Sequence, residues 1–185
     1  MSVKRSNSVL PGFVTVAVLG AVLGAAGAAQ AAEPARRYVV VQWDLEAAMK
    51  NESLDAARYA RFAQQARERG NAQLADVFER VATAERGEHL QRLAALSGQE
   101  AAPDPAEQEA ALARLPNQSD AANLRDAITN ERSQANTLRS EMVNRALKYG
   151  DVEAAQTFLT VGRGEIDNLL ALRAARKLAR QTAGS

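Results

Sequence analysis

The segment LEAAMKNE at residues 45–52 returns as LRDAITNE at residues 124–131. The shared residues recur at steps of three and four, which places them on one face of an α-helix. This first match spans an offset of 79 residues. Four further residues recur at an offset of 80: Gly70, Phe78, Val81 and Glu85 match Gly150, Phe158, Val161 and Glu165. A pair of helices is therefore duplicated. Two copies indicate a bundle of two pseudo-repeated helix pairs, since a solenoid needs about three or more stacked units.

Three breaks divide the chain into four long helical segments. Gly70-Asn71 and Gly150-Asp151 each combine a glycine suited to a helix C-terminus with an N-cap residue. Between them, the proline-containing segment 97–120 indicates a long crossover with one short helical turn. The predicted helices are Asp44–Arg69, Ala72–Leu96, Ala121–Tyr149 and Val152–Arg180. This connectivity predicts an all-α antiparallel four-helix bundle over residues 44–180, with an extended lead-in at 32–43 (Tyr38–Val41) and a tail at 181–185.

The composition excludes several classes of function. The 185 residues include no cysteine and one histidine, which excludes disulfide scaffolds, thiol catalysis, iron–sulfur clusters and zinc sites with several histidines. A net charge of +1 offers no electrostatic footprint for nucleic acid, so no nucleic-acid partner is expected. The length is typical of a single domain.

The first 31 residues have the features of an export signal. Lys4 and Arg5 precede an apolar stretch at residues 10–27, and Ala29-Gln30-Ala31 fits a cleavage site after Ala31. An uncleaved membrane anchor is the alternative, because about 20 apolar residues suffice to span a bilayer. Cleavage predicts a periplasmic or secreted domain.

Each predicted helix places one glutamate in the middle of its apolar stripe. These residues are Glu52, Glu85, Glu131 and Glu165. An unpaired carboxylate in an apolar core costs several kcal/mol, so it must be protonated, paired with a cation or bound to metal. Arg92 and Arg145 lie a turn or more away. A pair of metal cations would neutralise the four carboxylates, and oxygen ligands suit iron, manganese, magnesium or calcium. The alternative is that each glutamate flanks its stripe and reaches solvent.

Several motifs along the chain resemble those of rubrerythrins. The first helix pair carries Asn51-Glu52, Tyr59, Phe62-Ala63, Gly70, Ala75-Asp76, Phe78-Glu79, Ala84-Glu85 and Glu88-His89, and the second carries Asn130-Glu131, Gly150, Phe158 and Glu165. The resemblance implies a ferritin-like bundle in which the four glutamates bind a di-iron or iron–manganese centre. It also implies a reaction with peroxide or dioxygen, with Tyr59 as a hydrogen-bond donor that orients or donates to the oxygen.

The chain departs from the rubrerythrin pattern at three positions. Glu88 and Asn168 stand where the family usually has histidine, and Gln134 replaces a further carboxylate. The single histidine, His89, lies one residue later. Residues 88 and 89 point about 100° apart, so both are not expected to face the axis. The family pattern favours Glu88, a local unwinding of the helix favours His89, and a third alternative leaves His89 on the surface beside Arg92.

The lack of cysteine bears on the partners that the protein would need. The chain has no cysteine for the rubredoxin-type iron site that supplies electrons in this family, so peroxide reduction would need an external electron donor. Dimers are common in the family, so a homodimer is an open expectation.

Gly162-Arg163-Gly164 interrupts the fourth helix at a cost of about 1 kcal/mol per glycine relative to alanine. The glycines predict a close helix approach or a local bulge beside Glu165.

Two other functions remain open from the sequence. The bundle could store or buffer metal without turnover. It could also be a metal-free helical stress or interaction module, because Glu88, Gln134 and Asn168 replace stronger or charged ligands.

Overall fold

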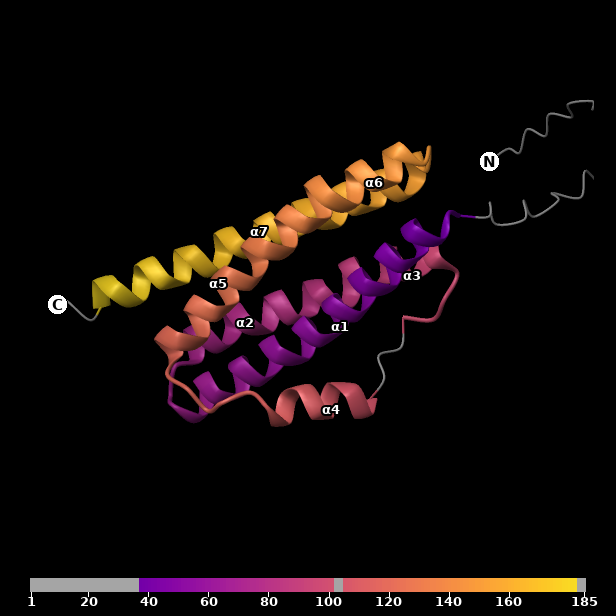
Figure 1. Cartoon of the computed structure of the whole chain (residues 1–185). Helices are drawn as coiled ribbons and strands as arrows, with labels where there is room; N and C mark the ends of the chain where they lie inside the picture. Colours follow the sequence, from indigo (N-terminus) through magenta and orange to yellow (C-terminus); the bar gives the residue numbers. More distant parts are fainter. Residues whose placement is uncertain (1–36, 102–104, 183–185) are drawn as a thin grey trace, which may run out of the picture. The chain divides into compact units, whose positions relative to one another are not determined.

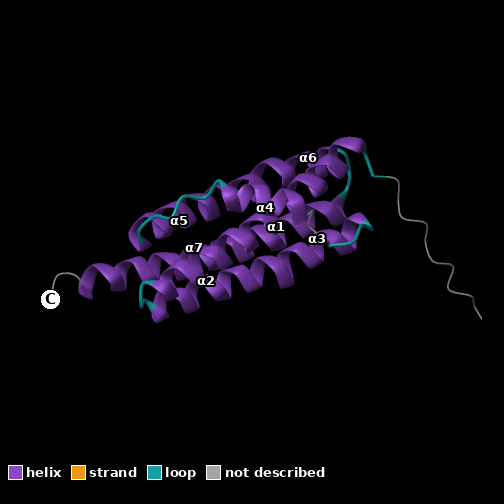
Figure 2. Cartoon of the chain, turned by 90° about the horizontal axis from the view of Figure 1, so that it is seen from below, coloured by secondary structure: helices purple, strands orange, loops and turns teal. Residues whose placement is uncertain are grey.

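A computed structural model of the chain describes residues 37–101 and 105–182. The expected export signal at 1–31, residues 32–36 of the lead-in and residues 183–185 lie outside this part. Every regular element in the described ranges is helical (Figure 2). The elements are α1 (Val39–Glu68), α2 (Ala72–Ala84), η1 (Glu85–His89), α3 (Leu90–Ser97), α4 (Pro105–Ala113), α5 (Asp120–Asn136), η2 (Thr137–Met142), α6 (Val143–Lys148) and α7 (Val152–Thr182), where η marks a π-helical turn. None of the described helices is both long and apolar enough to cross a bilayer.

The helices form the predicted bundle of two helix pairs (Figure 1). The first pair is α1 with the continuous rod α2–η1–α3, and the second is the rod α5–η2–α6 with α7. Helix α1 begins at Val39, so the expectation of an extended Tyr38–Val41 is wrong from Val39 onward. The reason is that Val41 is fully buried one turn before Leu45 and extends the apolar stripe.

The joints within each pair are tight turns of the same type. Gly70 has a φ of 77° and Gly150 a φ of 73°, a conformation that glycine adopts without strain. The residue after each glycine caps the next helix: Asn71 accepts from the backbone N–H of Leu74, and Asp151 from that of Ala154. The two pairs are therefore closed by matching turns, as the duplication predicts.

The crossover between the pairs contains more helix than the single turn expected. Helix α4 has nine residues. It is tied to α1 through Gln108, whose Nε2 donates to the carbonyl oxygen of Ser53 at 3.1 Å and to its hydroxyl at 2.9 Å. The crossover thus packs along the first helix.

The hydrophobic core is divided into two clusters by a polar layer. One cluster is built around Leu45, Leu93 and Phe158, and the other around Tyr59 and Phe78. Along each of the four rods, one buried glutamate separates the residues of the first cluster from those of the second: Glu52, Glu85, Glu131 and Glu165. The fold therefore brings the four predicted carboxylates to the middle of the bundle.

Candidate metal centre

The four glutamates are buried almost completely. Their exposed fractions are 1% for Glu52, 1% for Glu85, 0% for Glu131 and 1% for Glu165. They come from α1, η1, α5 and α7, so all four rods contribute one carboxylate. The alternative in which these glutamates flank their stripes and reach solvent does not hold. Their burial requires that protons, cations or metal balance the charge.

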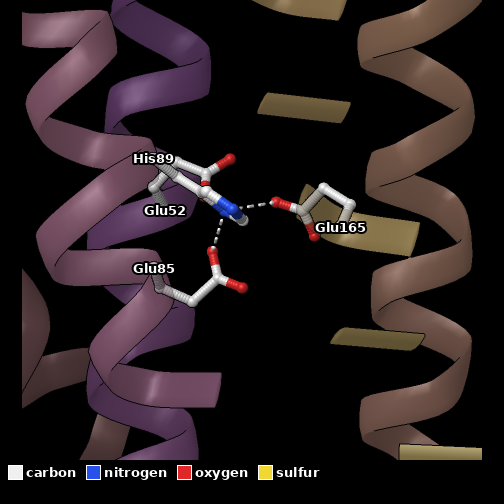
Figure 3. A group of neighbouring side chains, drawn as sticks. All are labelled: Glu52, Glu85, His89 and Glu165. Atoms are coloured by element: carbon white, nitrogen blue, oxygen red, sulfur yellow. Dashed lines mark hydrogen bonds and ion pairs between the residues drawn. The ribbon is translucent and has the colours of Figure 1, made fainter. Parts of the chain in front are cut away.

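The side chains of Glu52, Glu85, His89 and Glu165 form a compact group (Figure 3). Each offers one ligand atom, and these atoms all lie within 4.8 Å of one another. The Nδ1 atom of His89 is 3.1 Å from Glu52 Oε2, 3.2 Å from Glu85 Oε2 and 3.3 Å from Glu165 Oε1. The group therefore presents three carboxylates and one imidazole nitrogen to a common point.

A π-helical turn decides between Glu88 and His89. The turn η1 spans Glu85–His89, and because its i→i+5 hydrogen bonds take more residues per turn than an α-helix, the residue four positions after Glu85 stays on the inner face. His89 is only 2% exposed, so it does not lie on the surface. The side chain of Glu88 is 62% exposed and its Oε1 lies 3.2 Å from Arg92 Nη2. The expectation that Glu88 faces the axis is thus wrong, because the helix unwinds locally at this point.

Helix α7, the counterpart in the second pair of the α2–η1–α3 rod, is a continuous α-helix without a π-helical turn over Val152–Thr182, and comparing the two supports this explanation. Asn168 occupies in α7 the place that Glu88 occupies in the first pair, three residues after a buried glutamate. Asn168 is 8% exposed and donates from Nδ2 to Glu85 Oε1 at 2.7 Å. In a regular α-helix the residue at this spacing faces inward, whereas in η1 it faces outward.

Glu131 borders this group and is held by a hydrogen-bond network that includes Tyr59. The Tyr59 hydroxyl donates to Glu131 Oε1 and accepts from Asn130 Nδ2 at 3.0 Å. The same Asn130 amide nitrogen donates to Asp55 Oδ2 at 2.7 Å. The Tyr59 ring stacks on Phe78 with 11° between the planes. Tyr59 is therefore fixed both at its ring and at its hydroxyl.

Gln134 is not directed at the carboxylate group. Its Nε2 donates to Asp55 Oδ2 at 3.2 Å, and the residue is half-buried. The structure thus brings together Glu52, Glu85, His89 and Glu165, with Glu131, Tyr59 and Asn168 in contact with the group, and leaves Glu88 and Gln134 outside it.

Burial dominates the electrostatics of the group. Desolvation raises the pKa of Glu52 to about 7 and, together with the neighbouring carboxylates, that of Glu131 to about 11. The pKa of Glu85 and Glu165 is raised for the same reason. Desolvation lowers the pKa of His89, but hydrogen bonds to Glu165, Glu52 and Glu85 outweigh it and raise the pKa to about 12. Without metal, protons therefore neutralise the site.

The donor set fits a metal ion. Among the described residues, Arg145 forms a bidentate pair with Asp44, and Arg92 pairs with Glu88, so neither reaches the carboxylates. Within the described residues, two buried carboxylate oxygens, Glu52 Oε1 and Glu131 Oε2, have no hydrogen-bond partner, and Glu165 Oε1 has only a long contact of 3.3 Å with His89 Nδ1. Carboxylates with a single imidazole suit manganese and iron. A cation would satisfy these oxygens and release the protons.

Two functional residues were not predicted from the sequence: Asp55, and Asn130 in its role as a hydrogen-bond donor. Asp55 is 4% exposed and its carboxylate receives hydrogen bonds from Asn130 and Gln134. Its position three residues after Glu52 and four before Tyr59 is the helical spacing that could have identified it. Asn130 stands directly before Glu131 in the repeated Asn-Glu motif, so its proximity to the site was visible in the sequence.

One comparison with known proteins identifies a family. The family model described as Rubrerythrin matches residues 44–167, which include Glu52, Glu85, His89, Glu131 and Glu165 and end within α7, just before Asn168. No curated protein and no solved structure matches the chain.

Proposed function

The chain belongs to the rubrerythrin family, and from this premise we propose that it is an exported protein with a di-metal centre of iron, or of iron and manganese, that reacts with peroxide or dioxygen. The observation that carries the proposal is the burial of four carboxylates and one imidazole in a single layer between two hydrophobic clusters. Such a layer is costly to bury unless protons or cations balance its charge, and metal ions would do so with the carboxylates ionised. Bound iron or manganese would supply the redox chemistry.

The chain's own residues divide the work at this centre. Glu52, Glu85, His89 and Glu165 offer ligand atoms to one common point. Glu131 has one oxygen held by the Tyr59 hydroxyl and one without a partner, so its free oxygen is available to a second ion. Tyr59 keeps its proton, since burial and nearby carboxylates raise its pKa well above the ordinary value. Tyr59 can therefore donate a hydrogen bond to an oxygen species, as long as the bond to Glu131 is released.

The second ion position is the weaker of the two. Gln134 is bonded to Asp55, and Asn168 directs its amide nitrogen at Glu85. Neither residue offers a carboxylate. Between the two alternative functions, these features favour a metal-free helical module with a degraded site over a metal-storage protein.

Metal content is the first test. Protein purified without a histidine tag is reconstituted anaerobically with Fe²⁺ or Mn²⁺ and analysed for metal per chain. We expect one to two ions, and less than roughly a tenth of an ion would contradict the proposal. The variant Glu52→Gln/Glu165→Gln should lose the metal, whereas Glu88→Gln is the matched control, because Glu88 lies outside the group.

Turnover separates an oxidoreductase from a storage protein. Loaded protein is given hydrogen peroxide and a chemical reductant that stands for the external electron donor. Consumption of peroxide over many cycles supports the reaction, and a single stoichiometric oxidation supports storage. Export is tested separately, by the mass of the protein recovered from the periplasmic fraction, which should correspond to cleavage after Ala31.

A further inference from the structure

The two glycines inside α7 each face a π-helical turn. A Cβ atom built on Gly162 would lie 2.5 Å from Arg139 Cγ and 3.2 Å from Leu138 Cβ, both in η2. A Cβ atom on Gly164 would lie 2.0 Å from Nε2 and 2.8 Å from Cε1 of His89, in η1. The missing side chains therefore make room for the two places where the neighbouring rods bulge.

The contact at Gly164 differs in kind from the one at Gly162. The nearest atoms at Gly162 include the flexible side chain of Arg139, which is exposed and can move away. At Gly164 all three nearest atoms belong to the imidazole ring of a histidine that is 2% exposed. The ring is packed on all sides, so it cannot make room for a Cβ atom by a small adjustment. Any side chain at position 164 must therefore push the ring out of its present position.

The Gly164 contact also fixes which nitrogen faces the carboxylates. The Nε2 edge of the His89 ring lies against the α7 backbone, and Nδ1 lies 3.1–3.3 Å from the three carboxylates. A ring held along one edge presents the other edge in a fixed direction. We infer that Gly164 is a positioning residue, which seats the imidazole of His89 and makes its Nδ1 the nitrogen donor of the metal centre.

If the proposed metal centre is present, the position of His89 also affects which metal the site prefers. Imidazole nitrogen suits iron and nickel, and cobalt lies between these two in the order of affinities, whereas Mg²⁺, Ca²⁺ and Mn²⁺ are well matched by oxygen ligands. Displacing His89 would leave three carboxylates in place. Gly164 therefore sets the preference of the site for iron and cobalt over Mg²⁺ and Ca²⁺.

The experiment compares Gly164→Ala with Gly87→Ala. Gly87 lies in η1 next to the site, but a Cβ atom there meets nothing within 4 Å. The wild-type protein and both variants are prepared metal-free with ¹⁵N,¹³C-labelled histidine, and the single histidine gives one set of ring signals. We expect the ring shifts to change in Gly164→Ala and to stay unchanged in Gly87→Ala. Wild-type shifts in Gly164→Ala would overturn the inference.

Metal selectivity supplies the second readout. Gly164→Ala should weaken Co²⁺ binding by at least the roughly 10–100-fold that loss of a ligand's supporting partner costs, and change Ca²⁺ binding much less. An equal loss for both kinds of ion would overturn the claim of selectivity. If the wild-type protein binds no metal but the ring shifts change as expected, the result supports the claim that Gly164 positions His89 and contradicts the proposed function.

A double-mutant cycle keeps the inference testable should Gly164→Ala fold poorly. The substitution is repeated in a His89→Ala background, where the ring is gone. We expect Gly164→Ala to raise the unfolding constant in the wild-type background and to leave it equal or lower in the His89→Ala background. A destabilisation of the same size in both backgrounds would show that Gly164 is needed for another reason.

Discussion

Tyr59 shows how one residue joins the hydrophobic core to the polar layer. Its ring packs on Phe78 and Phe62, while its hydroxyl donates to Glu131 and accepts from Asn130. Removal of the hydroxyl alone would leave the packing in place but deprive a buried carboxylate of its donor. The free-energy cost of such a change falls mainly on the group left behind.

We therefore expect Tyr59→Phe to lower the free energy of unfolding by about 1–3 kcal/mol in the metal-free protein. Urea denaturation followed by circular dichroism measures the change. Tyr149→Phe is the control, since Tyr149 is 37% exposed and its loss should cost no more than about 0.5 kcal/mol. Equal effects of the two substitutions would show that the Tyr59 hydroxyl does not support Glu131.

The neighbours Glu88 and His89 give a second prediction at the residue scale. His89→Gln should weaken binding of Mn²⁺ by at least the roughly 10–100-fold cost of losing an outer partner, because it removes a nitrogen donor. Glu88→Gln should leave the affinity within about twofold, since an exposed carboxylate paired with Arg92 interacts only weakly through solvent. Titration against a chelator of known affinity measures both. A larger effect at Glu88 would mean that η1 changes conformation on metal binding and brings Glu88 to the ion.

At the scale of whole elements, the sequence predicted most of the fold because the relevant signals are local. The apolar stripes, the Gly70 and Gly150 turns and the prolines of the crossover each act within a few residues. The start of α1 and the length of α4 were mispredicted, since contacts from other elements decide them: Val41 joins the core, and Gln108 bonds to Ser53.

The candidate site was less predictable for the same physical reason. Repetition identified the four glutamates, but it could not choose between Glu88 and His89, because the choice depends on a π-helical turn. The turn requires room on the neighbouring helix, and Gly164 provides it more than 70 residues later in the chain. The glycines in α7 and the position of His89 one residue after the family's histidine are both visible in the sequence. Their connection becomes visible only in the structure, where Gly164 packs against the His89 ring.

The π-helical turn η1 leads to a prediction about a deletion. A single-turn π-helix holds one residue more than an α-helical turn, so deletion of Gly87 should convert η1 to α-helix and keep α3 on its original face. Deletion of Thr160 in α7 is the control, because α7 has no π-helical turn and the residues after the gap would rotate by about 100°. We expect cooperative thermal unfolding for the Gly87 deletion only. Its loss in both proteins would contradict the extra-residue explanation.

At the scale of the molecule, the bundle separates two tasks along its axis. The two hydrophobic clusters provide the stability, and the layer of carboxylates between them reduces it. Such a layer favours folding only when its charge is balanced, by protons in the metal-free state or by cations in the loaded state. Stability of the whole protein should therefore depend on both pH and metal.

The sign of the pH dependence follows from the raised pKa values. The pKa of Glu52 rises from 4.5 to about 7, that of Glu131 from 4.5 to about 11, and that of His89 from 6.5 to about 12. The folded metal-free protein thus holds more protons than the unfolded chain. Their contribution to stability is complete below a pH of about 4.5 and is lost as the pH rises, first through the pKa of Glu52.

We expect the Tm of the chelator-treated protein to fall between pH 5 and pH 9, and the Tm of the Mn²⁺-loaded protein to fall less. Metal competes with protons for the same oxygens, so the stabilisation by metal should grow as the pH rises. Thermal unfolding followed by circular dichroism at each pH measures both curves. Glu52→Gln removes the group that titrates near 7 and should flatten the metal-free curve between pH 5 and 7, whereas Glu88→Gln should not. A metal-free Tm that rises with pH would mean that the carboxylates are ionised without a cation, and the physical case for a metal centre would fail.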